Sequence, residues 1–498
     1  MEDKFELLKQ YLAQIEDLEG ALRLMGWDQQ TYMPPGAAQT RANQIATINR
    51  MAHELQTRDE LGQLLEELNH NIELWDYDSD EASIIRFNWR EYQKLVKIPA
   101  EKMEAFTATS TLAYEVWKEA RAKNDFNLFS PHLEKLLDLQ LEFTEFLQDG
   151  TENPYDSLVD FYEPGMTASM IHDVFSTIRP RLIDLIKTIS GTDQVDDAFL
   201  FVNPPQDDLL ELGRTMADKL GYSFEHGRLD LTTHPFTAGI SYRDARITTR
   251  IVDENPISTL FSCIHEAGHA IHRQQGNPSL YRTLTSQYSM GIGESQSRIY
   301  EVVIGMSREF WLHFYPEIQR IIPSLTHVSL EPFYRAINKI EPGLIRVDAD
   351  PVTYGLHIML RFELENLMLN GKVKILDLPE LWNVKMEEYL GLIPPDDAQG
   401  VLQDVHWTGL MGYFPSYLLG SIFAVQLWDK LVEEQPTCVS DMANGEFSPI
   451  TEWLGERIHT HGGKFTLLEI AERAVGDSLS SEPFMHYLNE KFGEIYRL

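Results

Sequence analysis

The chain has 498 residues, of which 43% are apolar, and this is enough to form a large buried core. Its 42 basic and 77 acidic residues give a formal charge of −35; so negative a surface repels phosphate backbones, and we expect no nucleic-acid partner. No stretch approaches the ~20 uninterrupted apolar residues of a membrane helix, and the first residues lack the pattern of a signal peptide. Cys263 and Cys438 are too few for a disulfide framework, so we expect a cytoplasmic protein.

Helical patterns dominate the first half of the chain. Apolar residues recur at helical spacing over 5–24, and similar patterns predict helices over 38–70, 101–123, 131–148, 168–189 and 206–220. The segment 28–36 interrupts the pattern and ends in Pro34-Pro35-Gly36. The stretch 149–166 is rich in Gly and Pro, and we interpret it as a loop and a candidate hinge.

One region has the pattern of β-structure. Polar and β-branched residues alternate over 227–252, and Asn255-Pro256 ends the alternation. A helix is then predicted over 257–275, and a further helix from about 293 begins the helical patterns that continue nearly to the C-terminus. The sequence therefore predicts a large, mainly α protein with one small β-sheet next to the helix at 257–275.

The helix that follows the predicted strands carries His265-Glu266-Ala267-Gly268-His269. Histidines four residues apart project from the same face of a helix, which suits two nitrogen ligands of one zinc ion. In this motif class Glu266 is the general base that takes a proton from a zinc-bound water. The three fixed residues of this motif occur by chance in a chain of this length at a rate on the order of a few per cent. The predicted strand-to-helix context therefore decides against a helix with two incidental histidines.

A catalytic zinc site needs a third protein ligand. Glu294 lies 25 residues after His269, which leaves room for a turn and a second helix to return to the metal. Glu301 is the alternative, seven residues further on and on the same face; if Glu294 binds the metal, Glu301 supports the site. His272 shares the face of both histidines but lies about one turn beyond them, so we expect a packing or substrate-facing role.

Further motifs extend along nearly the whole chain. They are Trp27-Asp28-Gln29, Met33-Pro34-Pro35-Gly36-Ala37, Tyr162-Glu163-Pro164-Gly165-Met166, His234-Pro235-Phe236, Asp244-x-Arg246-x-Thr248, Glu294-Ser295-Gln296-Ser297-Arg298, Ile345-Arg346-Val347-Asp348-Ala349-Asp350 and Gly400-x-x-Gln403-Asp404-x-His406-Trp407. With the zinc motif, they make the chain resemble the carboxypeptidase Taq family of metallocarboxypeptidases. Two positions depart from that pattern: Gly293 stands where the family usually has His, and His272 where it more often has an aromatic residue.

This resemblance implies a fold made almost entirely of helices, with a deep central groove that holds the metal. It implies one zinc ion per subunit, with cobalt as an alternative, and usually a homodimer. It also implies release of single C-terminal amino acids from peptides with broad preference. We expect residues 1–498 to form one catalytic unit, with a lid-like helical part at about 1–150 and an active-site core at about 200–430.

A carboxypeptidase must bind the free terminal carboxylate of its substrate. Arginine suits this because its planar guanidinium binds a carboxylate through two parallel hydrogen bonds. Arg346 is our first candidate, and Arg298 and Arg246 are the alternatives. For any of these arginines the competing interpretation is a structural ion pair, with Asp244, Asp348 or Asp350.

The tetrahedral intermediate of peptide hydrolysis needs hydrogen-bond donors near its oxyanion. We assign this role to His406 together with Tyr417, eleven residues on; Tyr413, seven residues on, is the alternative. The assignment is an analogy, because other helical zinc peptidases pair a late His with a Tyr at similar spacing. We expect His234 to shape the groove and contact substrate, and Asp404 to orient a histidine.

Two rival functions are compatible with parts of this pattern. A helical metallo-oligopeptidase would keep the metal but cut internally or release dipeptides, and Arg346 in its motif favours a carboxypeptidase over it. A binding or scaffolding protein would keep the fold without catalysis, and the intact Glu266 between two histidines argues against it.

Overall fold

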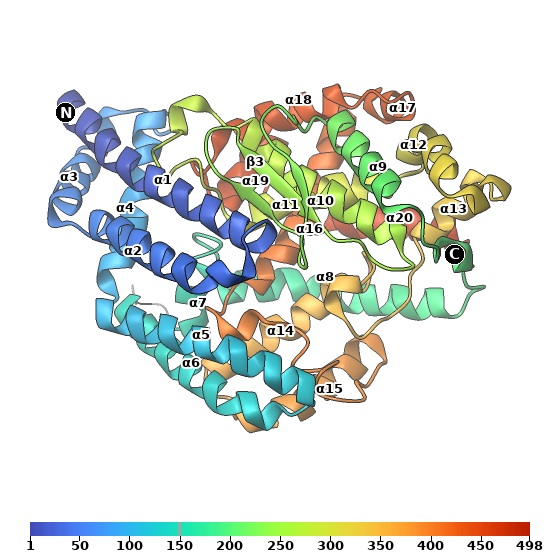
Figure 1. Cartoon of the computed structure of the whole chain (residues 1–498), viewed down its shortest axis with the longest axis horizontal. Helices are drawn as coiled ribbons and strands as arrows, with labels where there is room; N and C mark the ends of the chain where they lie inside the picture. The colour runs from blue at the N-terminus through green and yellow to red at the C-terminus, as the bar shows by residue number, and fades with distance from the viewer. Residues whose placement is uncertain (148–149, 151) are drawn as a thin grey trace. The chain divides into compact units, whose positions relative to one another are not determined.

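The computed structural model describes residues 1–147, 150 and 152–498 (Figure 1). Over these residues the chain forms α-helices α1–α20 and one three-stranded sheet, which confirms the predicted mainly α fold with a single small sheet. The first helices are α1 (Glu2–Thr31), α2 (Ala38–Gln56), α3 (Asp59–His70), α4 (Asp80–Lys97), α5 (Ala100–Lys123), α6 (Phe126–Leu147), α7 (Pro154–Val159), α8 (Ala168–Ser190), α9 (Gln206–Lys219) and α10 (Pro256–Gln274). The others are α11 (Met290–Arg298), α12 (Arg308–Ile321), α13 (Leu330–Ile337), α14 (Tyr354–Leu369), α15 (Leu378–Leu390), α16 (Phe414–Glu434), α17 (Cys438–Ala443), α18 (Ser448–Arg457), α19 (Leu467–Val475) and α20 (Glu482–Tyr496).

The chain divides into two compact units, each assembled from three separate stretches. The first unit comprises Met1–Leu95, Asp196–Ile337 and Ala424–Leu479, and the second comprises Val96–Val195, Asn338–Phe423 and Ser480–Leu498. The zinc motif lies in the first unit, and Arg346 and His406 lie in the second. The expected lid-like part at about 1–150 and core at about 200–430 stay a prediction.

Most predicted helices are present with small changes at their ends. Helix α1 extends to Thr31, beyond the pattern predicted over 5–24, and ends shortly before Pro34 and Pro35, which cannot continue a helix. The predicted helix over 38–70 is two helices, α2 and α3, and α4 was not predicted. Within the predicted loop 149–166 the chain forms the short helix α7; residues 148, 149 and 151 lie outside the described residues.

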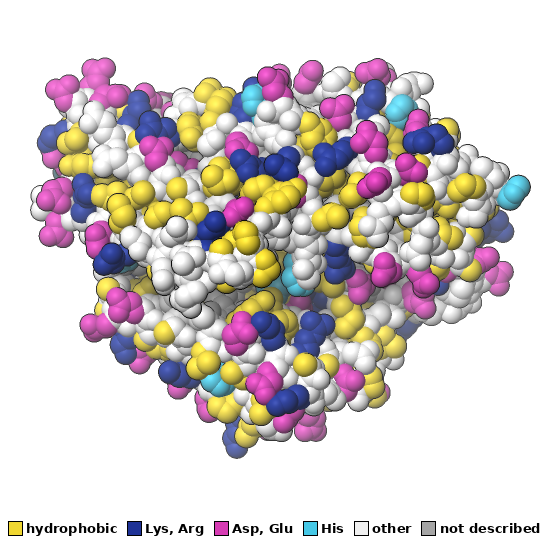
Figure 2. Space-filling view, viewed as in Figure 1, with side chains coloured by type: hydrophobic (Ala, Val, Ile, Leu, Met, Phe, Trp, Pro, Cys, Tyr) yellow, Lys and Arg dark blue, Asp and Glu magenta, His cyan; other side chains and the backbone are white. Residues whose placement is uncertain are grey.

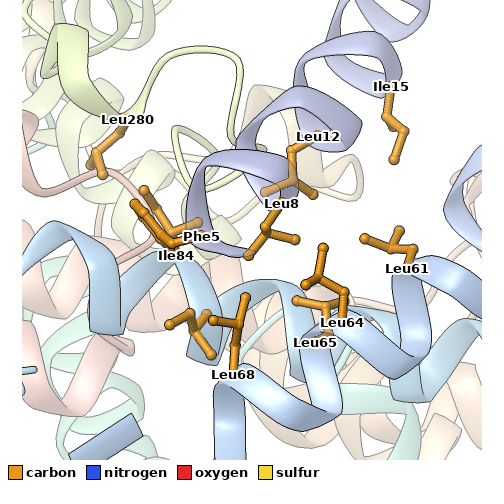
Figure 3. Packing of buried hydrophobic residues seen from close by; sticks show 11 residues of the cluster. Phe5, Leu8, Leu12, Ile15, Leu61, Leu64, Leu65, Leu68, Ile84 and Leu280 are labelled. Carbon is orange, nitrogen blue, oxygen red and sulfur yellow. The ribbon is translucent and has the colours of Figure 1, made fainter. Parts of the chain in front are cut away.

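A leucine-rich cluster fixes α1 in the first unit (Figure 3). Helix α1 inserts one apolar side chain per turn between α3, α4 and Leu280 of the loop after α10. Each such buried side chain contributes about 1.5–3 kcal/mol. The buried members are Phe5, Leu8, Leu12, Ile15, Leu61, Leu64, Leu65, Leu68, Ile84, Ile85 and Leu280.

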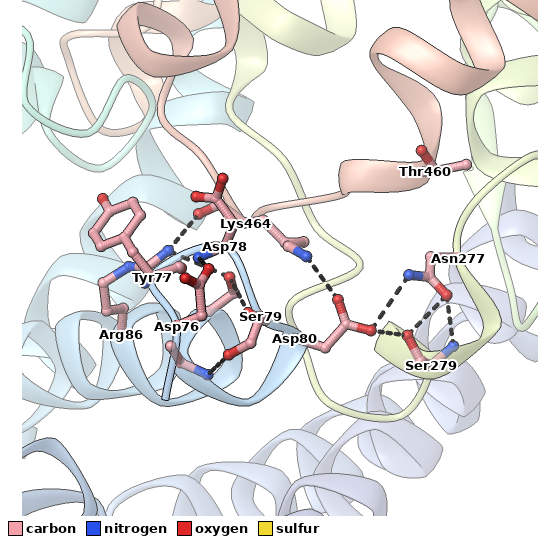
Figure 4. Close-up of polar contacts among 12 residues, drawn as sticks. Asp76, Tyr77, Asp78, Ser79, Asp80, Arg86, Asn277, Ser279, Thr460 and Lys464 are labelled. Atoms are coloured by element: carbon pink, nitrogen blue, oxygen red, sulfur yellow. Dashed lines mark hydrogen bonds and ion pairs between the residues drawn. The ribbon is translucent and has the colours of Figure 1, made fainter. Parts of the chain in front are cut away.

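A polar network centred on Asp80 joins three segments of the first unit (Figure 4). Asp80, at the start of α4, accepts hydrogen bonds from Ser279 and, at 3.5 Å, from the Asn277 amide, and it pairs with Lys464 at 2.7 Å. The Arg86 guanidinium donates to the Lys464 carbonyl at 3.2 Å. This network fixes the loop after α10 to α4 and to the chain near Lys464.

The small sheet lies against the zinc-motif helix, as predicted. Strands β1 (Leu229–Leu231), β2 (Thr237–Gly239) and β3 (Ala245–Thr249) are ordered β1-β3-β2, with β1 parallel and β2 antiparallel to β3. Helix α10 packs against β3, as Figure 1 shows, and Ile247 of β3 is fully buried. Strand β2 lies at an edge of this sheet, next to β3, and its Thr237 contacts α10.

Acidic and basic side chains are mixed on the visible surface rather than separated by sign (Figure 2). Among the described residues, no helix combines the length and the apolar character needed to cross a bilayer.

Candidate metal centre and substrate-binding residues

Helix α10 presents the two motif histidines on one face. Asn255 caps the helix by accepting a hydrogen bond from the Ser258 backbone N–H at 3.1 Å, and Pro256 occupies the first turn, where its missing N–H costs nothing. The rings of His265 and His269 follow one turn apart, with centroids 5.0 Å apart and planes at 81°. Both side chains remain partly exposed while the opposite face of α10 is buried.

A glycine in the motif lets α11 approach α10 closely. A Cβ atom on Gly268 would lie 2.6 Å from the carbonyl oxygen of Gln296 and 2.9 Å from the Cα of Ser297, both backbone atoms of α11. Only glycine fits at such a distance. The close approach places α11 where Glu294 can reach the two histidines.

His265, His269 and Glu294 form a group whose ligand atoms all lie within 4.8 Å of one another. His265 Nε2 is 4.0 Å from Glu294 Oε2, a separation that leaves space for an ion between them. The Ser297 hydroxyl donates to the same carboxylate oxygen at 3.0 Å and orients it. Two imidazoles and one carboxylate are a known ligand set of catalytic zinc, so the residues present fit a divalent ion.

Glu301 supports the histidine face instead of joining the group. It lies in a π-helical segment, Ile299–Gly305, that continues α11. Its carboxylate lies 2.8 Å from His265 Nδ1 and 2.8 Å from Arg298 Nη1. A carboxylate on Nδ1 leaves Nε2 free for a metal. Burial opposes protonation of His265, but the Glu301 carboxylate outweighs it and raises the His265 pKa.

Glu266 is held beside the histidines by the edge strand. The Thr237 hydroxyl lies 2.7 Å from Glu266 Oε2 and 2.9 Å from the Glu266 carbonyl oxygen, so one donor is shared by two acceptors of the same residue. The Glu266 side chain is buried, and burial raises its pKa to about 7. A buried carboxylate with one oriented oxygen is suited to general-base chemistry. The contact with Thr237 was not predicted from the sequence.

In the second unit, Arg346 is buried and pairs with Asp404. Its Nη2 lies 2.9 Å from Asp404 Oδ1 and its Nε lies 3.1 Å from Oδ2, while its guanidinium lies 5.0 Å from the centre of the Tyr417 ring. Arg346 therefore forms an ion pair, as its competing interpretation stated, but the partner is Asp404 rather than Asp348 or Asp350. Asp350 instead accepts backbone N–H groups just before α14.

Arg361 is a second arginine at the same carboxylate, and it was not predicted from the sequence. It is fully buried on α14, donates to Asp404 Oδ2 at 2.6 Å and to Gln403 Oε1 at 2.8 Å. Two guanidinium groups on one carboxylate hold the pKa of Asp404 far below its usual range, although burial opposes this. The one available sequence signal was an arginine in the middle of a strongly apolar helix.

His406 and Tyr417 lie together as expected, with His406 Nε2 at 3.2 Å from the Tyr417 hydroxyl. Tyr413, the alternative, packs edge-on against Tyr417 with ring centroids 4.8 Å apart. Burial lowers the pKa of His406 to about 4, against the pull of Asp404, so its imidazole is neutral near pH 7. The neutral ring has one donor and one acceptor nitrogen.

Three other candidate residues have different surroundings. Arg298 pairs with Glu301 next to the metal ligands. Arg246 forms a two-point ion pair with Asp244 and lies 4.5 Å over the Trp27 ring, which matches the structural alternative given for it. His234 is exposed in the loop between β1 and β2.

Comparison with known proteins links this geometry to one family. Residues 7–492 match the family model described as carboxypeptidase Taq (M32) metallopeptidase. The chain is 37% identical to carboxypeptidase 1 of Bacillus subtilis, covering 99% of this chain and 98% of that protein. It is also 37% identical to thermostable carboxypeptidase 1 of Thermus thermophilus over 95% of each. The crystal structure of an M32 carboxypeptidase from Deinococcus radiodurans matches with a TM-score of 0.95 at 35% identity, covering 100% of both chains.

Proposed function

Because the chain belongs to the carboxypeptidase Taq (M32) metallopeptidase family, it is a metallocarboxypeptidase, and we propose that it releases single C-terminal amino acids of many kinds from peptides, with Glu266 as general base. The observation that carries this proposal is the group of His265, His269 and Glu294 around one point, with Glu266 oriented beside it.

Zinc is the ion we propose for this group, with cobalt as the alternative. His265, His269 and Glu294 would hold it, and Glu301 and Ser297 would fix two of these ligands through hydrogen bonds. A divalent ion bound there supplies Lewis acidity, which lowers the pKa of a water and polarises the scissile carbonyl. One ion per subunit is sufficient for this ligand set.

Glu266 moves the proton in this proposal. Its Oε2 is oriented by the Thr237 hydroxyl, so Oε1 is available to accept a proton from the attacking water. The same carboxyl group can then donate that proton to the leaving amine. Burial keeps bulk water from competing for the carboxylate and strengthens its interaction with the charges that develop.

Arg346 remains our candidate for the substrate carboxylate. Arg346 and Arg361 together carry two positive charges and share one carboxylate, Asp404, so the group has one positive charge that a substrate carboxylate would balance. Arg361 is fully buried, which leaves Arg346 as the arginine nearer the surface. Arg298 and Arg246 pair with Glu301 and Asp244, whereas Arg346 shares Asp404 with Arg361, and this excess of positive charge favours Arg346 over them.

His406 and Tyr417 are our candidates for binding the oxyanion. Their hydrogen bond at 3.2 Å and the neutral state of His406 support a shared donor role, because two groups without net charge can donate as negative charge develops on the carbonyl oxygen. His234 is proposed to contact substrate from its exposed loop.

The test of the proposed function combines one variant with one pair of substrates. Glu266→Gln should keep its bound metal and lose activity by orders of magnitude, because the carboxamide cannot accept the proton. Metal content by elemental analysis and turnover of an N-blocked dipeptide are the measurements. The C-terminal amide of the same dipeptide distinguishes the rival function. A carboxypeptidase does not cleave the amide, whereas an oligopeptidase that cuts internally still cleaves it. Retained activity in Glu266→Gln would remove Glu266 from the mechanism.

We also propose a homodimer in the cytoplasm. Two buried cysteines without a disulfide, Cys263 and Cys438, support a reducing compartment. The family resemblance supports the dimer, and sedimentation of the metal-loaded protein would test it.

A further inference from the structure

A pocket in the first unit is separate from the group of metal ligands. It is formed by α1, the turn between β2 and β3, the last turn of α10, the loop over 276–288 and the chain near His459. The space inside it that the centre of a water-sized sphere can reach is about 60 Å³, and the pocket is partly open to solvent. His265, His269 and Glu294 do not line it.

Two arginines that line this pocket, Arg273 and Arg243, form no ion pair within 4 Å among the described residues, although Arg273 lies close enough to Glu16 to interact with its carboxylate electrostatically. The Arg273 guanidinium lies 5.3 Å from the centre of the Tyr288 ring and rests against Gly239, where a Cβ atom would lie 2.7 Å from Arg273 Cδ. Arg243 is exposed at the tip of the β2–β3 turn, with φ of 63°. In a chain with formal charge −35, unpaired guanidinium groups in a pocket favour an anionic group.

The same pocket contains a buried carboxylate that lacks one hydrogen bond. Glu16 is 6% exposed; one of its oxygens pairs with Arg23, and Oε2 has no donor among the described residues. A buried carboxylate oxygen without a donor is costly. This oxygen therefore favours a ligand that brings N–H donors or a positive charge.

His272 is a further buried polar group with no partner among the described residues. It is 1% exposed and stacks on Tyr288 with ring centroids 3.8 Å apart. The neighbouring His459 ring, by contrast, has both nitrogens bonded, at 2.6 Å to Gln275 and at 2.8 Å to Gln296. His272 can offer one donor and one acceptor to a ligand.

We propose that this pocket binds a free α-amino acid. The carboxylate would lie on Arg273 and Arg243, the ammonium group on Glu16 Oε2, and the side chain against Tyr242, Tyr281 and Leu280. A simple anion would leave Glu16 unsatisfied, and a simple cation would leave both arginines unpaired, whereas a zwitterion satisfies both. Free amino acids are what the proposed carboxypeptidase releases, so the inference rests on that function to supply the ligand.

The walls of the pocket are fixed by the two clusters already described. Glu16 directly follows Ile15 of the leucine-rich cluster, and Leu280 belongs both to that cluster and to the pocket (Figure 3). Asn277, on the same loop, is held by Asp80 in the polar network (Figure 4). A site with walls ordered in advance loses less entropy when it binds a ligand.

Binding can be measured without turnover. Titration calorimetry on the full-length, chelator-treated protein would use L-phenylalanine, 3-phenylpropionate, which lacks the ammonium group, and phenethylamine, which lacks the carboxylate. We expect L-phenylalanine to bind at least about tenfold more tightly than either analogue, because each loses charged hydrogen bonds. Arg273→Gln, Glu16→Gln and Arg243→Asn should each weaken binding of L-phenylalanine by about tenfold or more. Asn is used at Arg243 because it tolerates a positive φ.

Arg457→Gln is the matched control. Arg457 also lies over an aromatic ring, Trp453, and pairs with Glu434, but it is not part of the pocket. Binding of 3-phenylpropionate as tight as that of L-phenylalanine, or no binding at all, would overturn the proposal. So would binding that survives Arg273→Gln and disappears in Arg346→Gln, because the amino acid would then occupy the substrate site. None of these outcomes changes the result of the Glu266→Gln test.

Discussion

At the scale of single residues, the Tyr417 hydroxyl is the smallest group on which the proposed oxyanion site depends. It lies 3.2 Å from His406 Nε2 and is half-buried, so replacing it leaves the surrounding packing in place. We predict that Tyr417→Phe lowers kcat by about 10²–10³-fold, the usual cost of one oxyanion donor, with little change in KM. Steady-state kinetics on an N-blocked dipeptide checks this.

Tyr413→Phe is the matched comparison, because Tyr413 packs edge-on against Tyr417 and stacks near His406. It should change kcat much less. An equal or larger loss in Tyr413→Phe would transfer the oxyanion role to Tyr413.

In the second unit, the Asp404 carboxylate forms ion pairs with both Arg346 and Arg361. We predict that Asp404→Asn destabilises the protein by about 3–5 kcal/mol at pH 7, because two buried guanidinium groups lose their carboxylate. The folded pKa of Asp404 is depressed, so its contribution is complete above the unfolded value of about 3.9 and is lost as the pH falls below it.

Denaturant titrations of both proteins between pH 7 and pH 3 would measure the difference in free energy of unfolding. It should be constant above about pH 5 and shrink toward pH 3. A difference that grows on acidification would contradict the assignment.

At the scale of elements, the metal centre depends on the distance between α10 and α11. Gly268→Ala would add a Cβ atom 2.6 Å from the Gln296 carbonyl oxygen, and because this is backbone, α11 itself must move. We predict a loss of about 1–3 kcal/mol in stability, typical of an overpacked contact, together with weaker metal binding as Glu294 is displaced. Thermal unfolding and competition with a metal chelator would measure the two effects.

Gly26→Ala on α1 is the control for the same chemical change. Nothing lies within 4 Å of the added atom there, and alanine is a better helix former than glycine. It should leave metal affinity unchanged and raise stability by up to about 1 kcal/mol. Unchanged metal affinity in Gly268→Ala would show that the two helices can separate without moving Glu294.

What could be predicted from the sequence follows from how far apart the interacting residues lie. His265 and His269 share one helix, so spacing alone brought them together, and Glu294 lies on the next α-helix, after the connecting segment 275–289. The partner of Arg346 was expected among nearby aspartates, but it lies 58 residues further on. Thr237 likewise meets Glu266 through the pairing of β2, which the strand pattern does not specify.

At the scale of the whole molecule, the excess of negative charge opposes compaction. Basic residues are interspersed with acidic ones on the visible face, so local ion pairs form, but 42 cations cannot neutralise 77 anions (Figure 2). Added salt weakens both attraction and repulsion, and repulsion is larger at this net charge. We therefore predict that raising the ionic strength from about 0.01 M to 0.15 M, which shortens the Debye length from about 30 Å to 8 Å, raises the unfolding temperature at pH 8.

The pH dependence of this salt effect makes the prediction specific to charge. The sequence pI is about 4.8, so the repulsion that salt screens should fade as the pH approaches that value, and with it the gain in unfolding temperature. In a chain of 498 residues, each kcal/mol of repulsion that salt relieves raises the unfolding temperature by about 1 °C. Calorimetric scans at both ionic strengths, at pH 8 and near pH 5, would measure this. A salt effect of the same size at both pH values would mean that ion binding or solvent effects cause it, because the net charge differs greatly between them.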